Sequence, residues 1–216
     1  MPESPDTRDR LLAAAARLFH EQGYAATGVA TILREADVNS GSLYYYFDSK
    51  EDLLAGVLDR YLDLLEPEIL SRAKAAASDP VERVFALLGV YRWGLEVTGC
   101  TLGCPIGNLA LELGDAYPAL REKVEKNFQG WSGAVEGWLR EAAGRFPPGT
   151  DLAALSRFVL VVMEGGMMQA RARKSVEPYD DAVRQLRDYF DRLQASRASG
   201  PRGNPKNRNR KGKRSS

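Results

Sequence analysis

The sequence predicts an all-α protein of about nine helices. Two observations lead to this fold class: Ala, Leu, Glu and Arg dominate the 216 residues, and apolar residues recur at helical spacing. Runs of alternating Val, Ile and Thr, which would predict strands, are missing. A hydrophobic fraction of 44% is enough for a substantial core. The chain is therefore expected to be globular and helical.

Four helices are expected in the first third of the chain. The first covers residues 7–22, where apolar side chains form one stripe. Thr27 precedes a second stripe and offers its hydroxyl as an N-cap. A third, very short helix begins near Ser40. A fourth opens with a capping box at Ser49 and continues to about Pro67, which is long enough to connect two domains.

Five further helices are expected beyond this connection. They are periodic stretches separated by Pro and Gly clusters, at residues 81–97, 105–113, 118–143, 151–173 and 179–195. The last two carry wide apolar faces, which need a partner. That partner is either a second copy of the chain or the core of the same chain.

The second and third helices form a candidate DNA-binding motif. Two short helices joined by a tight turn, the second presenting small and aromatic polar residues, describe a helix-turn-helix, although an ordinary helical hairpin has the same outline. Three consecutive tyrosines at 44–46 cannot all be buried on so short a helix, so at least two should lie at the surface. Exposed aromatics beside Lys50 suit a DNA groove and its phosphates.

The run from residue 7 to residue 54 resembles the DNA-binding domain of the tetracycline-repressor (TetR/AcrR) family. It contains RLLAAAARLFHEQGYAATGVATILREADVNSGSLYYYFDSKEDLL, with F-x-x-x-G-Y, a Thr before the second helix and G-x-L-Y-Y-x-F-x-x-K-E-x-L in order. The resemblance implies a helix-turn-helix domain at 1–50, reaching about 66 with the connecting helix, and a helical effector-binding and dimerisation domain at 51–196. It also implies a homodimer that binds double-stranded operator DNA, most often as a repressor.

The resemblance assigns roles to individual residues of the motif. Phosphate contacts are expected from Thr27, Tyr45 and Lys50. Base edges are expected to be approached by Asn39, Ser40, Gly41, Ser42 and Tyr44. Tyr46 stands where the family more often has His. The first 50 residues hold five Lys or Arg against seven Asp or Glu, so binding should depend strongly on dimer geometry.

The resemblance also implies a ligand pocket in the C-terminal half and a dimer interface formed by residues 151–195. Candidate pocket residues are large, soft or aromatic, and would suit a small apolar or planar effector. They are Trp93, Phe128, Trp131, Trp138, Met163, Met167 and Met168. The alternative for each of them is an ordinary place in the core.

The segment TGCTLGCPIGNLALELGD resembles the N-ethylmaleimide-responsive branch of the family. Cys104 precedes a predicted helix, where a thiol has a lowered pKa and raised nucleophilicity. We expect it either to sense electrophiles, with Arg171 as a candidate electropositive neighbour, or to be a small buried thiol that packs a bend. Cys100 could bond to it only if the glycines keep the segment out of a helix.

Other functions find little support in the sequence. An enzyme is disfavoured because the one histidine, His20, lies on the first helix as a surface or capping residue, and because no phosphate-binding Gly loop or G-x-S-x-G turn occurs. Two thiols without nearby His or carboxylate ligands make a poor zinc site, so neither metal nor cofactor is expected. A sensor that acts only through protein partners remains an alternative, which failure to bind DNA would favour.

The positive charge of the chain is concentrated at its C-terminal end. The net charge of +1 hides a tail at 197–216 with eight Lys or Arg and no acid, which leaves 22 basic and 29 acidic residues before it. This tail should be disordered, and either attracts DNA nonspecifically or has no role. No signal-peptide core occurs, and no apolar stretch approaches the roughly 18 residues that span a bilayer. We therefore expect a cytoplasmic, nucleoid-associated protein without membrane contact, and its two cysteines fit a reducing compartment.

Overall fold

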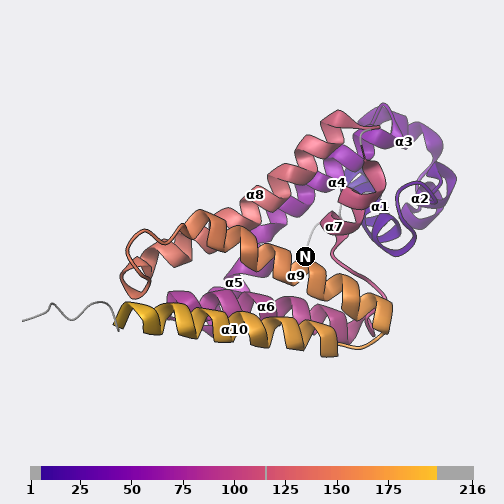
Figure 1. Ribbon diagram of the computed structural model, residues 1–216. Coiled ribbons are helices and arrows are strands. Elements are labelled where there is room, and N and C mark those ends of the chain that lie inside the picture. The colour runs from indigo at the N-terminus through magenta and orange to yellow at the C-terminus, as the bar shows by residue number, and fades with distance from the viewer. Residues whose placement is uncertain (1–5, 115, 199–216) are drawn as a thin grey trace, which may run out of the picture.

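The computed structural model describes residues 6–114 and 116–198, and within these ranges every regular element is a helix (Figure 1). The helices of the N-terminal part are α1 (Thr7–Gln22), α2 (Val29–Ala36) and α3 (Ser40–Tyr46). They are followed by α4 (Lys50–Leu64), the π-helical turn η1 (Leu65–Leu70) and α5 (Ser71–Ala76). The C-terminal part contains α6 (Pro80–Val97), α7 (Pro105–Leu113), α8 (Pro118–Glu141), the 3-10 turn η2 (Ala143–Arg145), α9 (Leu152–Arg173) and α10 (Glu177–Ala198). The all-α prediction is confirmed.

The first three helices pack around a small apolar centre of fully buried side chains, Leu11, Ile32 and Leu43. Helices α1, α2 and α3 begin where the sequence predicts, but the cap of α2 differs. Its N-cap is Gly28, which provides no side-chain hydrogen bond, so the prediction that Thr27 caps this helix is wrong. The Thr27 hydroxyl instead donates to the carbonyl oxygen of Gly23, 2.6 Å away, and thereby braces the turn between α1 and α2.

The predicted fourth helix is longer than its sequence pattern indicates. Ser49 caps α4 as expected, accepting from the amide of Asp52 at 3.0 Å. Pro67 was expected to end the helix, but it lies within η1, and the helical path continues to Ala76. A wider π-helical turn tolerates the missing N–H of proline and its bulky ring. With α4, η1 and α5 as one rod, the part of the chain that the structure describes contains nine helical rods.

The C-terminal helices build a second, larger layer that shares one continuous apolar core with the N-terminal part. Helix α8 lies beside α4, and α9 and α10 form a hairpin next to α6 (Figure 1). Tyr179 of α10 is fully buried, and its hydroxyl donates to the carbonyl of Leu88 in α6 at 2.8 Å. This bond fixes the hairpin against α6.

Helix α9 corrects one expectation about apolar segments. It has 22 residues, 18 of which form a window with a mean hydropathy of 1.3, and by length and composition alone it could cross a membrane. The core helix of a globular protein passes the same test, and α9 packs along α8 and α10.

The last helix ends three residues later than the sequence predicts, because α10 runs to Ala198 rather than to residue 195. The remainder of the basic tail predicted at 197–216 lies outside the described residues.

Candidate nucleic-acid interface and ligand pocket

Helix α3 is organised to present its tyrosines outward. Asn39 caps it through Oδ1, which accepts from the Ser42 amide at 2.9 Å and from the Ser42 hydroxyl at 3.1 Å. Leu43 is buried and anchors the inner face. The three tyrosines point away from it, with 60%, 81% and 36% of their surface exposed for Tyr44, Tyr45 and Tyr46. The prediction that at least two of them lie at the surface is confirmed.

The other predicted contact residues divide into an exposed and an inward-facing group. Ser40 and Gly41 are exposed at the start of α3. Thr27 is only 1% exposed and its hydroxyl is already engaged, so that hydroxyl has no surface to offer a phosphate. The Lys50 ammonium donates to the backbone carbonyl of Tyr24 at 2.5 Å and lies 4.1 Å from the centre of the Tyr24 ring. Burial lowers the pKa of Lys50.

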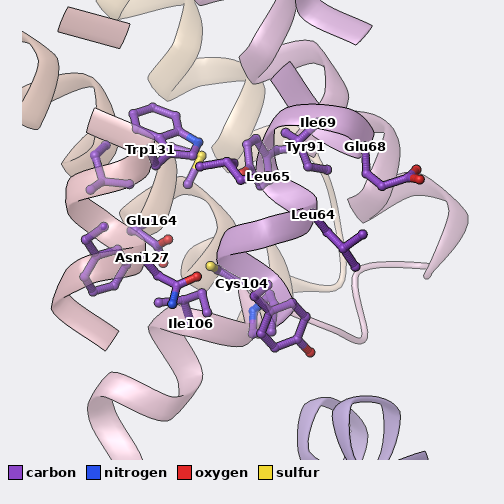
Figure 2. Close-up of a pocket in the computed structure, with 15 residues that line it drawn as sticks. Leu64, Leu65, Glu68, Ile69, Tyr91, Cys104, Ile106, Asn127, Trp131 and Glu164 are labelled. Carbon is purple, nitrogen blue, oxygen red and sulfur yellow. The ribbon is translucent and has the colours of Figure 1, made fainter. Parts of the chain in front are cut away.

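The larger part of the chain contains an apolar pocket of about 300 Å³ (Figure 2). Four of the predicted residues line it: Phe128, Trp131, Met163 and Cys104. The others that complete the wall are Tyr61, Leu64, Leu65, Glu68, Ile69, Tyr91, Pro105, Ile106, Asn127, Leu160 and Glu164. Helices α4, α6, α7, α8 and α9 and the turn η1 thus all contribute to one cavity.

The remaining pocket candidates lie elsewhere. Trp93 and Met167 line a second hollow of about 370 Å³, next to His20. Trp138 is a buried core residue, and Met168 is exposed on α9. Helical spacing identifies large apolar residues, but it does not separate those that border a cavity from those that fill the core.

The environment of Cys104 differs from the expected one. The residue caps α7, and its sulfur accepts from the amide of Gly107 at 3.4 Å. However, the side chain is buried, and burial together with the nearby Glu164 carboxylate raises the pKa of the thiol well above its usual range. The predicted lowering of this pKa is therefore wrong. Desolvation and a like-charged neighbour outweigh the helix N-terminus.

The expected neighbours of Cys104 are also placed differently. The Arg171 guanidinium donates to Asn108 Oδ1 at 3.2 Å, and the acidic Glu164 takes the place expected for a cation. Cys100 and Cys104 are both free and buried. Cys100 adopts a left-handed backbone conformation with φ of 55° in the turn after α6. Among the described residues, no cluster of three or more metal-ligating side chains occurs.

Three contacts tie the pocket walls to the N-terminal helices. Glu112, near the end of α7, accepts from the backbone amides of Tyr24 at 2.8 Å and Ala25 at 2.6 Å. Pocket-lining Tyr61 donates its hydroxyl to the carbonyl of Ala16 in α1 at 3.3 Å.

The third contact comes from His20, which was expected to be a surface or capping residue. Its Nε2 lies 2.7 Å from the carbonyl oxygen of Gly103, directly before the pocket-lining Cys104. Burial lowers the pKa of this imidazole. His20 is therefore a bridge between α1 and the segment that precedes α7, and the prediction of a surface or capping role is wrong.

Several residues of the pocket and of its links to the N-terminal helices carry no clear signal in the sequence. Glu164 and Glu112 resemble any other charged residue of an amphipathic helix, and Tyr91 resembles an ordinary core residue. Their roles depend on side chains that lie far away in the chain, as the 88-residue separation between Glu112 and Tyr24 illustrates. Only the three-dimensional arrangement identifies them.

Two family models match the chain. Residues 11–57 match the model described as bacterial regulatory proteins, tetR family, and residues 80–186 match the tetracyclin repressor-like C-terminal domain. An uncharacterised HTH-type transcriptional regulator of Mycobacterium tuberculosis is 30% identical over 191 residues, which cover 85% of this chain and 93% of that protein. The HTH-type transcriptional repressor DhaR of Mycobacterium sp. strain GP1 is 28% identical over 175 residues, or 80% of this chain and 86% of DhaR.

The fold has close counterparts among solved structures. The reduced form of E. coli NemR superposes with a TM-score of 0.74 and 23% identity, covering 85% of this chain and 96% of NemR. At that identity the likeness extends to the fold alone. The matched models and relatives name regulators, so the enzyme alternative falls away. The chain belongs to the tetracycline-repressor family and is a DNA-binding transcriptional regulator.

Proposed function

We propose that the protein is a homodimeric cytoplasmic repressor that leaves a palindromic operator when a small apolar molecule enters the pocket lined by Trp131 and Cys104. Residues 1–50 would bind DNA and residues 51–196 would bind the effector and the second subunit. One observation carries this proposal. Helix α7 begins in the pocket wall at Pro105 and Ile106, and Glu112 near its other end holds the turn between α1 and α2.

The outer face of α9 and α10 supports the dimer. Phe158 and Val161 of α9 are 43% and 66% exposed, and Tyr189 of α10 is 46% exposed. The rings of Phe158 and Tyr189 lie 5.6 Å apart and form one apolar surface with Val161 and Met168. Two such hairpins would bury this surface in a four-helix interface with two-fold symmetry. A two-fold dimer would place two α3 helices on successive half-sites of the operator. Binding two half-sites at once would offset the weak affinity expected from the excess of acidic residues in the N-terminal part.

Covalent modification of Cys104, as in the N-ethylmaleimide-responsive branch, is the second candidate for control. It is favoured by the position of Cys104 in the pocket wall, where an electrophile that enters the cavity would reach the sulfur. The raised pKa of the thiol opposes it, because the thiolate is the nucleophile. Reversible ligand binding is therefore the first candidate.

A gel-shift assay on the DNA upstream of the protein's own gene tests the proposal. We expect wild-type protein and Cys104→Ser to retard this duplex as dimers, while a scrambled duplex stays free. N-ethylmaleimide should release wild type but leave Cys104→Ser bound if the thiol is the sensor, and should release neither if control is reversible. Lack of binding to this duplex would refute repression of the protein's own gene.

A further inference from the structure

The pocket contains two polar atoms that no protein group satisfies. Glu164 Oε1 and Trp131 Nε1 are buried, and neither has a hydrogen-bond partner. Both residues line the cavity of about 300 Å³. In the part of the chain that the structure describes, they are the two buried side-chain N or O atoms in this situation. A buried polar group without a partner is costly. Trp131 Nε1 can still interact with the nearby Tyr91 hydroxyl, so Glu164 Oε1 is the atom for which a bound molecule would supply the partner.

The Glu164 carboxylate is held at this position by two residues of the segment around α7. One oxygen, Oε2, occupies the space beside Gly107, where any Cβ would collide with it. The Cys104 thiol lies close enough to the same carboxylate for Glu164 to raise its pKa. Figure 2 shows the Glu164 side chain and the Cys104 sulfur directed toward the same space. The other oxygen, Oε1, is buried and has no hydrogen-bond partner.

The remaining wall determines which charge the pocket accepts. Its lining contains no Lys, Arg or His side chain and two carboxylates: the partly buried Glu164, and the exposed Glu68, which pairs with Arg72 outside the pocket at 3.4 Å. Four aromatic side chains accompany them: Tyr61, Tyr91, Phe128 and Trp131. Aromatic faces and carboxylates attract cations, whereas an anion would find no counter-charge there. The volume lies at the lower end for ligand pockets, so the bound molecule is small.

We propose that the pocket binds a small lipophilic amine, whose ammonium group pairs with the free oxygen of Glu164 while its carbon skeleton packs against Phe128 and Trp131. This inference rests on the proposed function, because it assigns the chemistry of the effector to the same cavity. It extends that function by distinguishing amines from neutral and acidic molecules of equal shape.

The protonation of Glu164 supports the assignment and gives it a second signature. Burial raises the pKa of this carboxyl group, because the empty pocket solvates the carboxylate poorly. An ammonium ion favours the carboxylate, so amine binding strengthens as the pH rises through the titration of Glu164. The other titratable groups that face Glu164 are Cys104, Tyr91 and Tyr179, whose pKa values are all raised, with Tyr61 and rim residue Glu68 farther along the wall. The thiol and hydroxyls therefore stay neutral near pH 7.

Calorimetric titration of the full-length protein tests the inference with matched probes. Benzylamine, 2-phenylethylamine and cyclohexylamine are compared with their alcohol counterparts and with phenylacetate. We expect each amine that fits to bind about tenfold or more tightly than its alcohol. Glu164→Gln should abolish this preference, whereas Glu68→Gln on the exposed rim should retain it. Equal binding of amine and alcohol, a preference that survives Glu164→Gln, or failure of every amine to bind would overturn the inference.

A pH series on the wild-type protein keeps the test independent of any variant. Amine affinity should rise as the pH increases above the ordinary glutamate pKa of 4.5 and Glu164 loses its proton, whereas alcohol affinity should not. A flat amine profile would overturn the inference. The gel-shift assay is run separately, so that failure of one proposal is visible without the other. Amine binding without DNA release would refute the control mechanism alone, and DNA release by alcohols but not amines would refute the amine assignment alone.

Discussion

Replacement of Glu112 by Ala should loosen the DNA-binding helices from the pocket domain. In wild type the two carboxylate oxygens accept from the amides of Tyr24 and Ala25 at 2.8 and 2.6 Å. Buried hydrogen bonds to charged groups each contribute about 1.5–3 kcal/mol, but this carboxylate is exposed and water competes for it. We therefore expect a total loss of about 1–2 kcal/mol, which corresponds to a lowering of Tm by about 2–8 °C for a chain of this size.

Hydrogen exchange is the direct assay, because both donors are backbone amides. Exchange at residues 24 and 25 should accelerate about tenfold in Glu112→Ala, since 1.4 kcal/mol corresponds to a factor of ten. Glu112→Gln keeps one acceptor oxygen and should show about half of the free-energy change. Glu122→Ala, at an exposed glutamate of α8, serves as the matched control. Unchanged protection of both amides in Glu112→Ala would refute the assignment of Glu112 as the link.

Three further predictions concern the DNA face, the dimer and the thiol. Tyr45→Ala removes a side chain that is 81% exposed, so it should weaken operator binding about tenfold in fluorescence anisotropy without lowering Tm, and unchanged affinity would exclude a DNA contact. Val161→Glu places a charge in the proposed α9 interface and should convert the dimer to monomer in sedimentation velocity. Arg157→Glu, on the same helix, is the control that tests whether a change of charge alone matters. A dimer that persists in Val161→Glu would contradict this interface. Burial raises the pKa of Cys104 above the ordinary thiol pKa of 9.0. Labelling of the Cys100→Ser variant by N-ethylmaleimide, which then reports on Cys104 alone, should therefore be slow at pH 7 and should accelerate as the pH rises above 9.0. Fast labelling at neutral pH would contradict the buried, protonated thiol.

The sequence allows the helices to be predicted because their apolar periodicity is local. Even the short α3 follows from Asn39 and Ser40 at its start and from Leu43 and Phe47 on its inner face. The end of α4 is predicted wrongly at Pro67, because a proline can either end a helix or lie in a π-helical turn, and packing against neighbouring helices determines which occurs.

The site was harder to predict than the fold. The exposed tyrosines follow from the length of α3, but the pKa of Cys104 does not follow from its place at a helix start. The sign of that shift depends on burial and on Glu164, 60 positions away in the sequence. Likewise Thr27 has the chemistry of an N-cap, yet the turn after α1 offers its hydroxyl a better acceptor at Gly23. Residue type predicts what a side chain could do, and long-range packing determines which option is realised.

Helix α7 is short enough to act as a rigid lever. From Cys104 to Glu112 the helical rise is about 12 Å, at about 1.5 Å per residue. A tilt of about 10° around the pocket end would displace the Glu112 end by about 2 Å. The bonds from Glu112 to the α1–α2 turn are only 2.6 and 2.8 Å long, so such a displacement would either break them or carry the turn along. In the proposed dimer, a ligand that tilts α7 by about 10° would therefore change the spacing of the two α3 helices on DNA.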